Sequence, residues 1–233
     1  MQDFAQPHSN DKKRTTLADA AWALLAIHDV DKIGLDMVAD TAGIDHGLAG
    51  VLGGSVQRLV LGKMAALDHQ SVMESFEDIE DAGEVSTREK IIEGLLHRFE
   101  TYAPYRAQID QLNRSARRHP ELALRLLDGL EAVVRRILAM AGDSAHGLKG
   151  MLRVKGVVAV FLATARVWMK DESPDLAATM KMLDQQMVKA EEWGVSLRLF
   201  DGKHADHADG LFPNALGLFK ALFTDYAQQI EEE

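Results

Sequence analysis

Apolar residues recur every three or four positions along almost the whole chain, and this helical period is the feature that most limits how the chain can fold. No segment alternates apolar and polar residues with the period of two that a half-buried strand needs. Several glycines and prolines, among them Gly43, Gly142 and Pro120, fall at the edges of the periodic segments, where they begin or end helices. The pattern predicts an all-α protein. Helices are expected over residues 16–28, 36–42, 46–52, 55–80, 87–102, from near 103, from near 119 to 141, and over 147–170, 174–193 and 212–230.

Local residues indicate where some of these helices begin. Thr16 is the predicted N-cap of the first helix, because its hydroxyl can accept a hydrogen bond from the first turn. The run Ser-Pro-Asp at residues 173–175 is predicted to supply a cap, a first-turn proline and a favourable acid to the next helix. A polar loop at 201–209 contains His204 and His207, whose side chains we expect to be solvated rather than bound to a metal.

Two short predicted helices near the N-terminus meet at Gly43, and the second of them ends at Gly53 and Gly54. Short helices joined by a glycine turn are the pattern of a helix-turn-helix. We therefore predict a helix-turn-helix head at residues 1–60 and a larger helical body at residues 61–233.

The composition excludes several classes of function. The chain has no cysteine, which rules out disulfides, thiolate catalysis and cysteine-based zinc sites. It also has no P-loop, dinucleotide-binding, nucleophile-elbow or zinc-protease motif, so we expect no enzyme activity, no cofactor and no metal site. The first residues, up to Arg14, show no secretory pattern, and the longest weakly charged stretch, residues 157–165, is far shorter than the roughly 20 residues that span a bilayer. We expect a folded cytoplasmic protein without a membrane span.

Residues 35–44, Leu-Asp-Met-Val-Ala-Asp-Thr-Ala-Gly-Ile, resemble the second helix and the turn of the TetR family of transcription regulators. In that family an apolar residue and an alanine pack inward, and a glycine makes the turn. The next short helix, which here begins at Asp45 with Gly47 in the family's glycine position, is the one that reads DNA. The helix order is similar to the family over nearly the whole chain. The resemblance implies a homodimer that binds duplex DNA through its heads and a small apolar effector in its body.

The resemblance also implies which residues contact DNA. The basic run stands in the place of the family's N-terminal arm, and the other candidates lie at the start of the recognition helix and on the long helix that follows it. Most would contact phosphates, and His46 would reach a base edge. The predicted DNA-binding residues are Lys12, Lys13, Arg14, Asp45, His46, Gly47, Arg58 and Lys63.

The predicted head carries a charge that is unfavourable for binding DNA. Residues 34–60 contain three acids, Asp36, Asp40 and Asp45, and one base, Arg58, a net charge of −2. Neutralisation of phosphates by lysine and arginine supplies most non-specific DNA affinity. The basic run ahead of the first helix therefore has two interpretations, an arm that reaches a minor groove or a solvated tail.

Residues 53–60, Gly-Gly-Ser-Val-Gln-Arg-Leu-Val, are similar to the degenerate head of a second group with the same fold, the lipid-binding accessory proteins of ubiquinone biosynthesis. The body segments 168–173 and 178–184 also resemble theirs. This resemblance implies an alternative function, a protein that binds isoprenoid lipids and has lost DNA binding. Similar segments also occur in TetR-like regulators, so both functions stay open at this point.

Flexible and aromatic apolar side chains are concentrated on the predicted body helices. Such stripes are typical of a packed core, but methionine also lines adaptable pockets, and ligand pockets often lie between helices. The resemblance implies a ligand cavity. Its predicted lining residues are Met64, Met73, Phe76, Leu96, Phe99, Tyr102, Met151, Phe161 and Trp168.

The helix predicted at 147–170 and the one after it indicate a subunit interface, because charged residues border apolar ones there as at the rim of a paired surface. The last predicted helix, 212–230, has Lys220 as its only basic residue, so packing on the body or on a partner is expected rather than membrane docking. The predicted homodimer contacts are Arg153, Arg166, Leu176, Met180, Leu183 and Met187.

Overall fold

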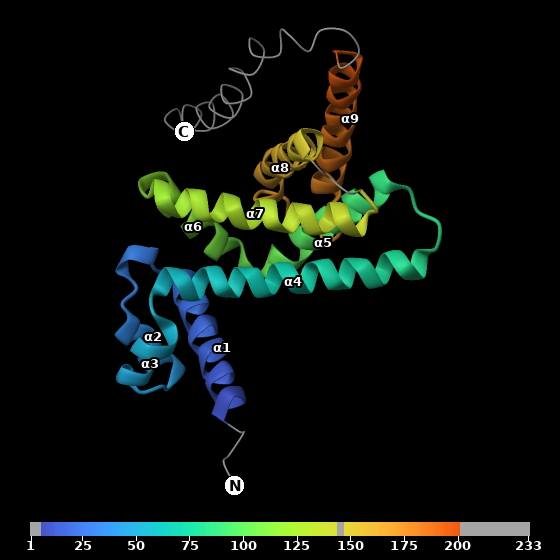
Figure 1. Cartoon of the computed structure of the whole chain (residues 1–233). Coiled ribbons are helices and arrows are strands. Elements are labelled where there is room, and N and C mark those ends of the chain that lie inside the picture. The colour runs from blue at the N-terminus through green and yellow to red at the C-terminus, as the bar shows by residue number, and fades with distance from the viewer. Residues whose placement is uncertain (1–5, 144–146, 201–233) are drawn as a thin grey trace. The chain divides into compact units, whose positions relative to one another are not determined.

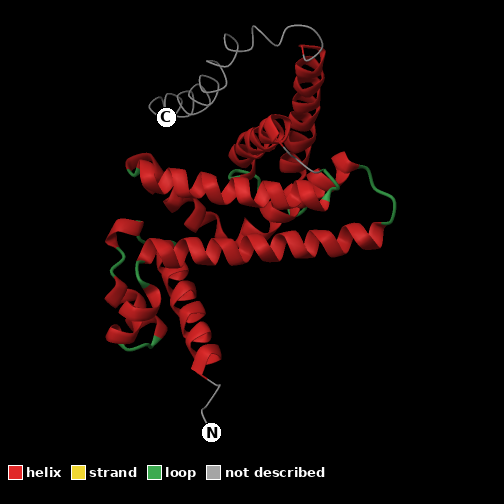
Figure 2. Ribbon diagram, in the orientation of Figure 1, coloured by secondary structure: helices red, strands yellow, loops and turns green. Residues whose placement is uncertain are grey.

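The structure, a computed structural model, describes residues 6–143 and 147–200. Every regular element in those two ranges is a helix, as Figure 2 shows, and the predicted all-α class is confirmed. None of the described helices is both long and apolar enough to cross a membrane. Residues up to Met187 form one compact unit, and the packing reported below lies within it. The loop predicted at 201–209 and the helix predicted at 212–230 lie outside the described residues.

The N-terminal head has the predicted helix-turn-helix arrangement. It contains α1 (Gln6–Leu25), the 3-10 turn η1 (Val30–Lys32), α2 (Leu35–Ala42) and α3 (His46–Gly53), and both α2 and α3 pack on α1 (Figure 1). Gly43 has left-handed backbone angles, φ 64° and ψ 35°, which glycine adopts without steric cost, and it turns the chain from α2 into α3. The buried residues of the head include Leu17, Ala21, Leu25, Val38 and Ala49.

Helix α1 differs from its prediction at both ends. It begins at Gln6 rather than at Thr16, and it ends at Leu25 rather than at His28. Thr16 is therefore not an N-cap: its hydroxyl donates a hydrogen bond to the Lys12 carbonyl oxygen, at 3.0 Å, within the helix. The described side chains before Leu17 are exposed, so no apolar face marks this part of the helix in the sequence.

Helix α4 (Val56–Ala82) leaves the head and continues into the body as one helix of 27 residues. It packs on α1 at the head end and on α5 and α7 in the body (Figure 1). Ser55 is its N-cap, with a hydroxyl oxygen that accepts a hydrogen bond from the Arg58 backbone N–H at 3.2 Å. The predicted boundary between residues 60 and 61 falls inside α4, so the head and the body share a helix and the division into two domains stays a prediction.

Helix α5 (Thr87–Tyr102) begins with a capping box. The Glu89 backbone N–H donates to the Ser86 hydroxyl oxygen at 3.3 Å, and the Ser86 backbone N–H donates to the Glu89 carboxylate at 2.9 Å. Two N–H groups that have no partner within the helix are satisfied in this way. The capping box explains why the helix starts where the sequence predicted it.

Two prolines mark the helices that follow. Pro104 lies within the 3-10 turn η2 (Ala103–Tyr105), and α6 (Arg106–Arg118) starts after this turn, later than predicted. Pro120 is the first residue of α7 (Pro120–Met140), as expected for a residue whose missing N–H would have no partner there.

Helix α8 (Gly147–Trp168) packs on α7, and α9 (Ala177–Phe200) follows after a short loop. The helix predicted to begin at Pro174 begins at Ala177 instead. The Ser173 hydroxyl oxygen accepts a hydrogen bond from the Ala177 backbone N–H at 2.9 Å, and Asp171 also organises this turn. Its carboxylate accepts hydrogen bonds from the Ser173 hydroxyl and from the hydroxyl and the backbone N–H of Thr179, the last two at 2.7 and 2.8 Å. These hydrogen bonds hold the pKa of the Asp171 carboxyl well below its usual range. Helix α9 also runs to Phe200 rather than ending near Trp193.

Gly94 marks the closest approach of α5 to α7. A Cβ at this position would lie 2.8 Å from Ile137 Cγ2 and 3.2 Å from Met140 Cε. Because both neighbours are on the inner side of α7, we expect Gly94→Ala to lower the free energy of unfolding by about 1–3 kcal/mol through overpacking. Gly129→Ala, within the neighbouring helix α7, is the control, since nothing lies within 4 Å of its Cβ position.

The control should leave stability unchanged or raise it by up to about 1 kcal/mol through helix propensity. Urea denaturation followed by circular dichroism measures both variants. Equal effects of the two substitutions would contradict the close packing of α5 on α7.

Candidate functional site

The exposed surface of the helix-turn-helix carries an acidic cluster around His46, the first residue of α3. The Nε2 atom of His46 lies 2.7 Å from Asp40 Oδ1, and its Nδ1 atom lies 3.6 Å from Asp36 Oδ1. The hydrogen bond to Asp40 is the main cause that raises the pKa of His46, and the charges of Asp36 and Asp45 act in the same direction. Since the chain has no Lys or Arg from residue 33 to 57, this surface is acidic.

Helix α3 presents few side chains that could read bases. Asp45 is its N-cap, and its carboxylate accepts a hydrogen bond from the Leu48 backbone N–H at 2.9 Å. Gly47 and Gly50 are exposed and have no side chain, and Val51 is 80% exposed. A polar contact from α3 to a base edge would thus have to come from His46, which is already hydrogen-bonded to Asp40.

The basic residues of the head lie on α1 and α4. Lys12, Lys13 and Arg14 are exposed within the helix α1, so the basic run is helical rather than an extended arm. Arg58 is exposed in the first turn of α4. Lys63 forms an ion pair with Asp19 of α1, with 2.7 Å between Nζ and Oδ1, and is therefore a poorer candidate for a phosphate contact.

The aromatic residues predicted to line a ligand cavity pack on one another in the body. The Phe99 ring of α5 stacks on the Phe161 ring of α8 with 4.6 Å between centroids, and Trp168 lies 5.6 Å from Phe99. Leu96 and Tyr102 are buried near them in sequence on α5. The rest of the predicted set lies elsewhere: Met64 is half-buried, and Met73, Phe76 and Met151 are exposed.

A buried polar cluster next to these aromatic rings was not predicted from the sequence. The Arg98 Nε atom donates to Asp68 Oδ1 at 2.8 Å, and the Tyr102 hydroxyl donates to the same oxygen at 3.0 Å. The Arg98 guanidinium also lies over the rings of Tyr102 and Phe161, 4.7 and 4.6 Å from their centroids. Burial raises the pKa of Tyr102, with a further contribution from Asp68 that Arg98 opposes. The cluster ties α4 to α5 and α8.

Two depressions open to solvent lie beside this core. One of about 370 Å³ is lined by residues of α5 and α6 and of the loop before α9, among them Glu100, Arg106 and Asp171. The other, of about 310 Å³, lies between α4 and α5 and is lined by His97, Glu100 and Glu74 among others. The predicted ligand residues line neither of these two depressions. Trp168, whose indole N–H has no hydrogen-bond partner, lies under Arg106 of the first, with 5.1 Å from the guanidinium carbon to the ring centroid.

The residues predicted for a dimer interface separate into two groups in the structure. Leu183 and Met187 of α9, and Leu176 before it, are buried within this single chain. Arg153 pairs with Asp143, while Met180 is 45% exposed and Arg166 is exposed. The buried residues of this set pack within one chain, and the exposed ones lie on the surface of that chain. The homodimer therefore stays a prediction.

Searches against known proteins show the fold. Neither a protein-family model nor a curated protein matches the sequence. Among solved structures, a TetR transcriptional regulator from Nitrosomonas europaea superposes with a TM-score of 0.62 at 16% identity, over 77% of this chain and 98% of that one. A TetR-family transcriptional regulator from Streptomyces coelicolor superposes with a TM-score of 0.55 at 14% identity, over 91% of this chain and 98% of that one.

The helix-turn-helix head and the helical body thus define a TetR-like fold, as predicted. At these identities the likeness establishes the architecture and leaves the function to the chemistry of this chain's own residues.

Proposed function

We propose that this protein is a TetR-like, ligand-responsive transcriptional regulator that binds duplex DNA as a homodimer. The observation that carries the proposal is the head itself, in which α2, the Gly43 turn and α3 pack on α1 as a helix-turn-helix. The two solved structures compared above are described as transcriptional regulators, which supports the same function.

DNA binding by this head depends on phosphate contacts. The exposed basic residues Lys12, Lys13 and Arg14 of α1 and Arg58 of α4 supply the positive charge, because α2 and α3 contain none. Contacts to phosphates position a protein on DNA without reading its sequence. His46 is the residue that would recognise a base, and to do so it has to exchange its hydrogen bond with Asp40 for one with a base edge.

The proposed effector is a small apolar molecule held in the body. The depression that Arg106 helps to line supports this part of the proposal, because Arg106 also lies over the Trp168 ring and so connects this solvent-open space to the aromatic core of the body. A ligand that binds one conformation of the body more tightly than another raises the population of that conformation, and with it the arrangement of the heads that belongs to it. Helix α4 is the physical connection, since the same helix packs on α1 in the head and on α5 and α7 in the body.

The acidic surface of α2 and α3 favours a second candidate, a lipid-binding accessory protein of the kind used in ubiquinone biosynthesis, with the same fold and no DNA binding. Asp36, Asp40 and Asp45 surround His46 on the face where DNA would lie. Three carboxylates close to a polyanion oppose binding, and no Lys or Arg of α2 or α3 offsets them.

Affinity for duplex DNA at different salt concentrations tests the first candidate. Fluorescence anisotropy with a labelled random duplex should show binding near 50 mM salt that weakens steeply towards 200 mM. In Lys12→Gln/Lys13→Gln/Arg14→Gln, the slope of log affinity against log salt should become shallower by about 0.9 for each phosphate that is no longer neutralised. Asp36→Asn/Asp40→Asn should raise affinity, because two repelling carboxylates are removed.

The matched control is Arg125→Gln/Arg135→Gln/Arg136→Gln on α7, which changes the net charge equally but away from the head. It should leave the slope unchanged. Absence of binding by the unchanged protein near 50 mM salt would rule out the regulator. A hydrophobic molecule that co-purifies and is visible in native mass spectrometry would then support the lipid-binding candidate.

A further inference from the structure

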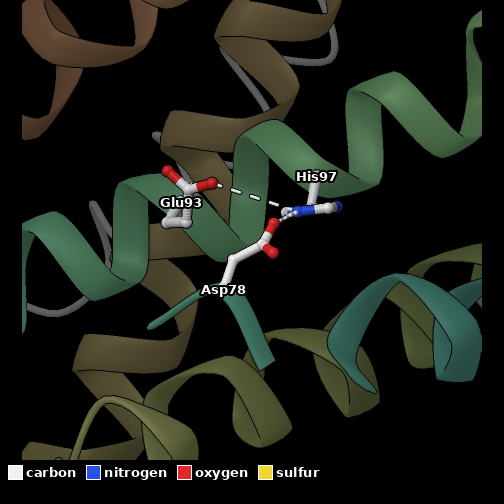
Figure 3. A group of neighbouring side chains, drawn as sticks. All are labelled: Asp78, Glu93 and His97. Atoms are coloured by element: carbon white, nitrogen blue, oxygen red, sulfur yellow. Dashed lines mark hydrogen bonds and ion pairs between the residues drawn. The ribbon is translucent and has the colours of Figure 1, made fainter. Parts of the chain in front are cut away.

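We propose that Asp78 of α4 and Glu93 and His97 of α5 form a binding site for a divalent transition-metal ion such as Zn²⁺. One ligand atom from each residue can be chosen so that all three lie within 4.8 Å of one another. Figure 3 shows the two carboxylates directed at the same edge of the imidazole ring. The sequence did not predict this site, because Asp78 lies on another helix and 19 positions before His97.

The carboxylates converge on one nitrogen, and this distinguishes His97 from the other carboxylate-paired histidines among the described residues, His46 and His119. Asp78 Oδ2 lies 2.7 Å and Glu93 Oε1 lies 4.0 Å from the same atom, His97 Nε2. At His46 the two nearest carboxylates sit at opposite ring nitrogens, Asp40 at Nε2 and Asp36 at Nδ1. An ion bound to a single ring nitrogen can be reached by two carboxylates only in the first arrangement.

The distances allow an ion after small side-chain rotations. Bonds of about 2.0–2.2 Å from zinc to nitrogen and oxygen place neighbouring ligand atoms roughly 3.3–3.5 Å apart. Asp78 therefore has to move slightly away from Nε2 and Glu93 slightly towards it. The Asp78 and Glu93 side chains are 63% and 42% exposed and can rotate, whereas His97, at 15%, is held by its surroundings.

Glu100 completes the environment of the imidazole. Its Oε2 atom lies 4.0 Å from His97 Nδ1, on the side of the ring opposite to Asp78 and Glu93. A carboxylate that accepts the second ring N–H of a metal-bound histidine fixes the tautomer and raises the basicity of the ligand. Glu93 and Glu100 lie four residues before and three residues after His97, so one face of α5 carries both a proposed ligand and a carboxylate that a small rotation would bring within hydrogen-bond distance of Nδ1.

The charge around His97 favours a cation. Three carboxylates surround the imidazole, with Asp78 at 2.7 Å and Glu93 and Glu100 each at 4.0 Å from a ring nitrogen. A divalent ion would replace the repulsion among these carboxylates by attraction. One imidazole nitrogen with two carboxylate oxygens suits zinc and its first-row neighbours better than Mg²⁺ or Ca²⁺, which prefer oxygen ligands alone.

Three protein ligands leave a coordination position for water or a small ligand. The Asp78 and Glu93 side chains are 63% and 42% exposed, so solvent can reach an ion held between them and His97 Nε2. The ion would also connect α4 to α5. Because the unfolded chain lacks this arrangement, binding should raise the melting temperature in proportion to the logarithm of free metal concentration.

Isothermal titration of the full chain with ZnCl₂ at neutral pH tests the site. The titration should be made in a His204→Gln/His207→Gln background, which removes the histidine pair at residues 204 and 207 as a competing source of ligands. We expect one ion per chain. His97→Gln should weaken binding by at least tenfold, and Asp78→Asn and Glu93→Gln should each weaken it, while Glu100→Gln should weaken it by about tenfold through the outer partner.

His119→Gln is the matched control, because His119 also lies beside two carboxylates, 2.6 Å from Asp31 and 3.4 Å from Glu121, but through opposite nitrogens. It should bind zinc as the background protein does. Circular dichroism of each variant shows whether it is folded, and Co²⁺ absorption of the folded variants reports the ligand set independently. Zinc affinity that survives His97→Gln, or that falls equally in His119→Gln, would overturn the proposal, as would absence of binding by the unchanged site.

Discussion

Asp68→Ala should lower the free energy of unfolding by about 3–5 kcal/mol, because it leaves the buried Arg98 guanidinium without its counter-charge. The side chains of Arg98 and Asp68 are 9% and 6% exposed, and their atoms lie 2.8 Å apart. The Tyr102 hydroxyl loses the same acceptor, although it can still donate to the Met64 carbonyl oxygen at 3.1 Å. Chemical denaturation measures the loss.

Two further variants separate the charge effect from a general effect of truncation. Asp81→Ala, at an exposed position of the same helix, should change stability by less than about 0.5 kcal/mol. Asp68→Leu/Arg98→Met should recover most of the loss, since replacing both partners of a buried ion pair by apolar groups is often neutral. A double variant as unstable as Asp68→Ala alone would show that the charge is not the cause.

Phe99→Ala should also cost about 3–5 kcal/mol, the range expected when a large buried aromatic side chain is truncated. Phe99 is 2% exposed and lies against both Phe161 and Trp168. Removing its ring leaves a cavity between α5 and α8 that these neighbours can fill only in part. Thermal and urea unfolding give the change in stability.

This prediction bears on the proposed ligand site, because the sequence assigned Phe99 to a cavity wall. Truncating a residue that lines an open cavity removes less van der Waals attraction than truncating one whose ring is covered on both sides. Phe76→Ala, at another residue of the predicted set that is 40% exposed, should cost less than about 1 kcal/mol. Similar small losses for both variants would favour a cavity at Phe99, whereas the expected difference favours a packed core with the effector beside Arg106.

The helices could be predicted because their apolar faces repeat with the helical period, and the errors fall where that signal is weak. The first half of α1 has no apolar face, so Gln6 could not be recognised as its start. At residues 173–175 the pattern Ser-Pro-Asp is typical of a helix start, but α9 begins only at Ala177, and the Asp171 carboxylate accepts hydrogen bonds from Ser173 and Thr179 across this turn. Which side chain accepts a given backbone N–H depends on how the turn is folded, and the local sequence pattern does not show this.

The sites were harder to predict than the fold, because their residues come from different helices. Asp68 and Arg98 are 30 positions apart, and Asp78 and His97 are 19 apart. A polar residue inside an apolar stripe, such as Asp68 directly after Leu67 on α4, is the one local sign that a buried partner exists. The acidity of the head, in contrast, was visible in the sequence, because exposed charges on a short segment keep their sign however the segment folds.

Helix α4 acts mechanically as a rigid rod that belongs to both halves of the protein. From Ser55 to Asp78 it extends roughly 35 Å, at about 1.5 Å of rise per residue. If the rod tilts by only about 5° about its far end, the near end is displaced by roughly 3 Å, close to the separation of successive base pairs. In such a tilt, a small movement at the Asp78 end would be magnified geometrically at the head end of the helix, which packs on α1 and α3.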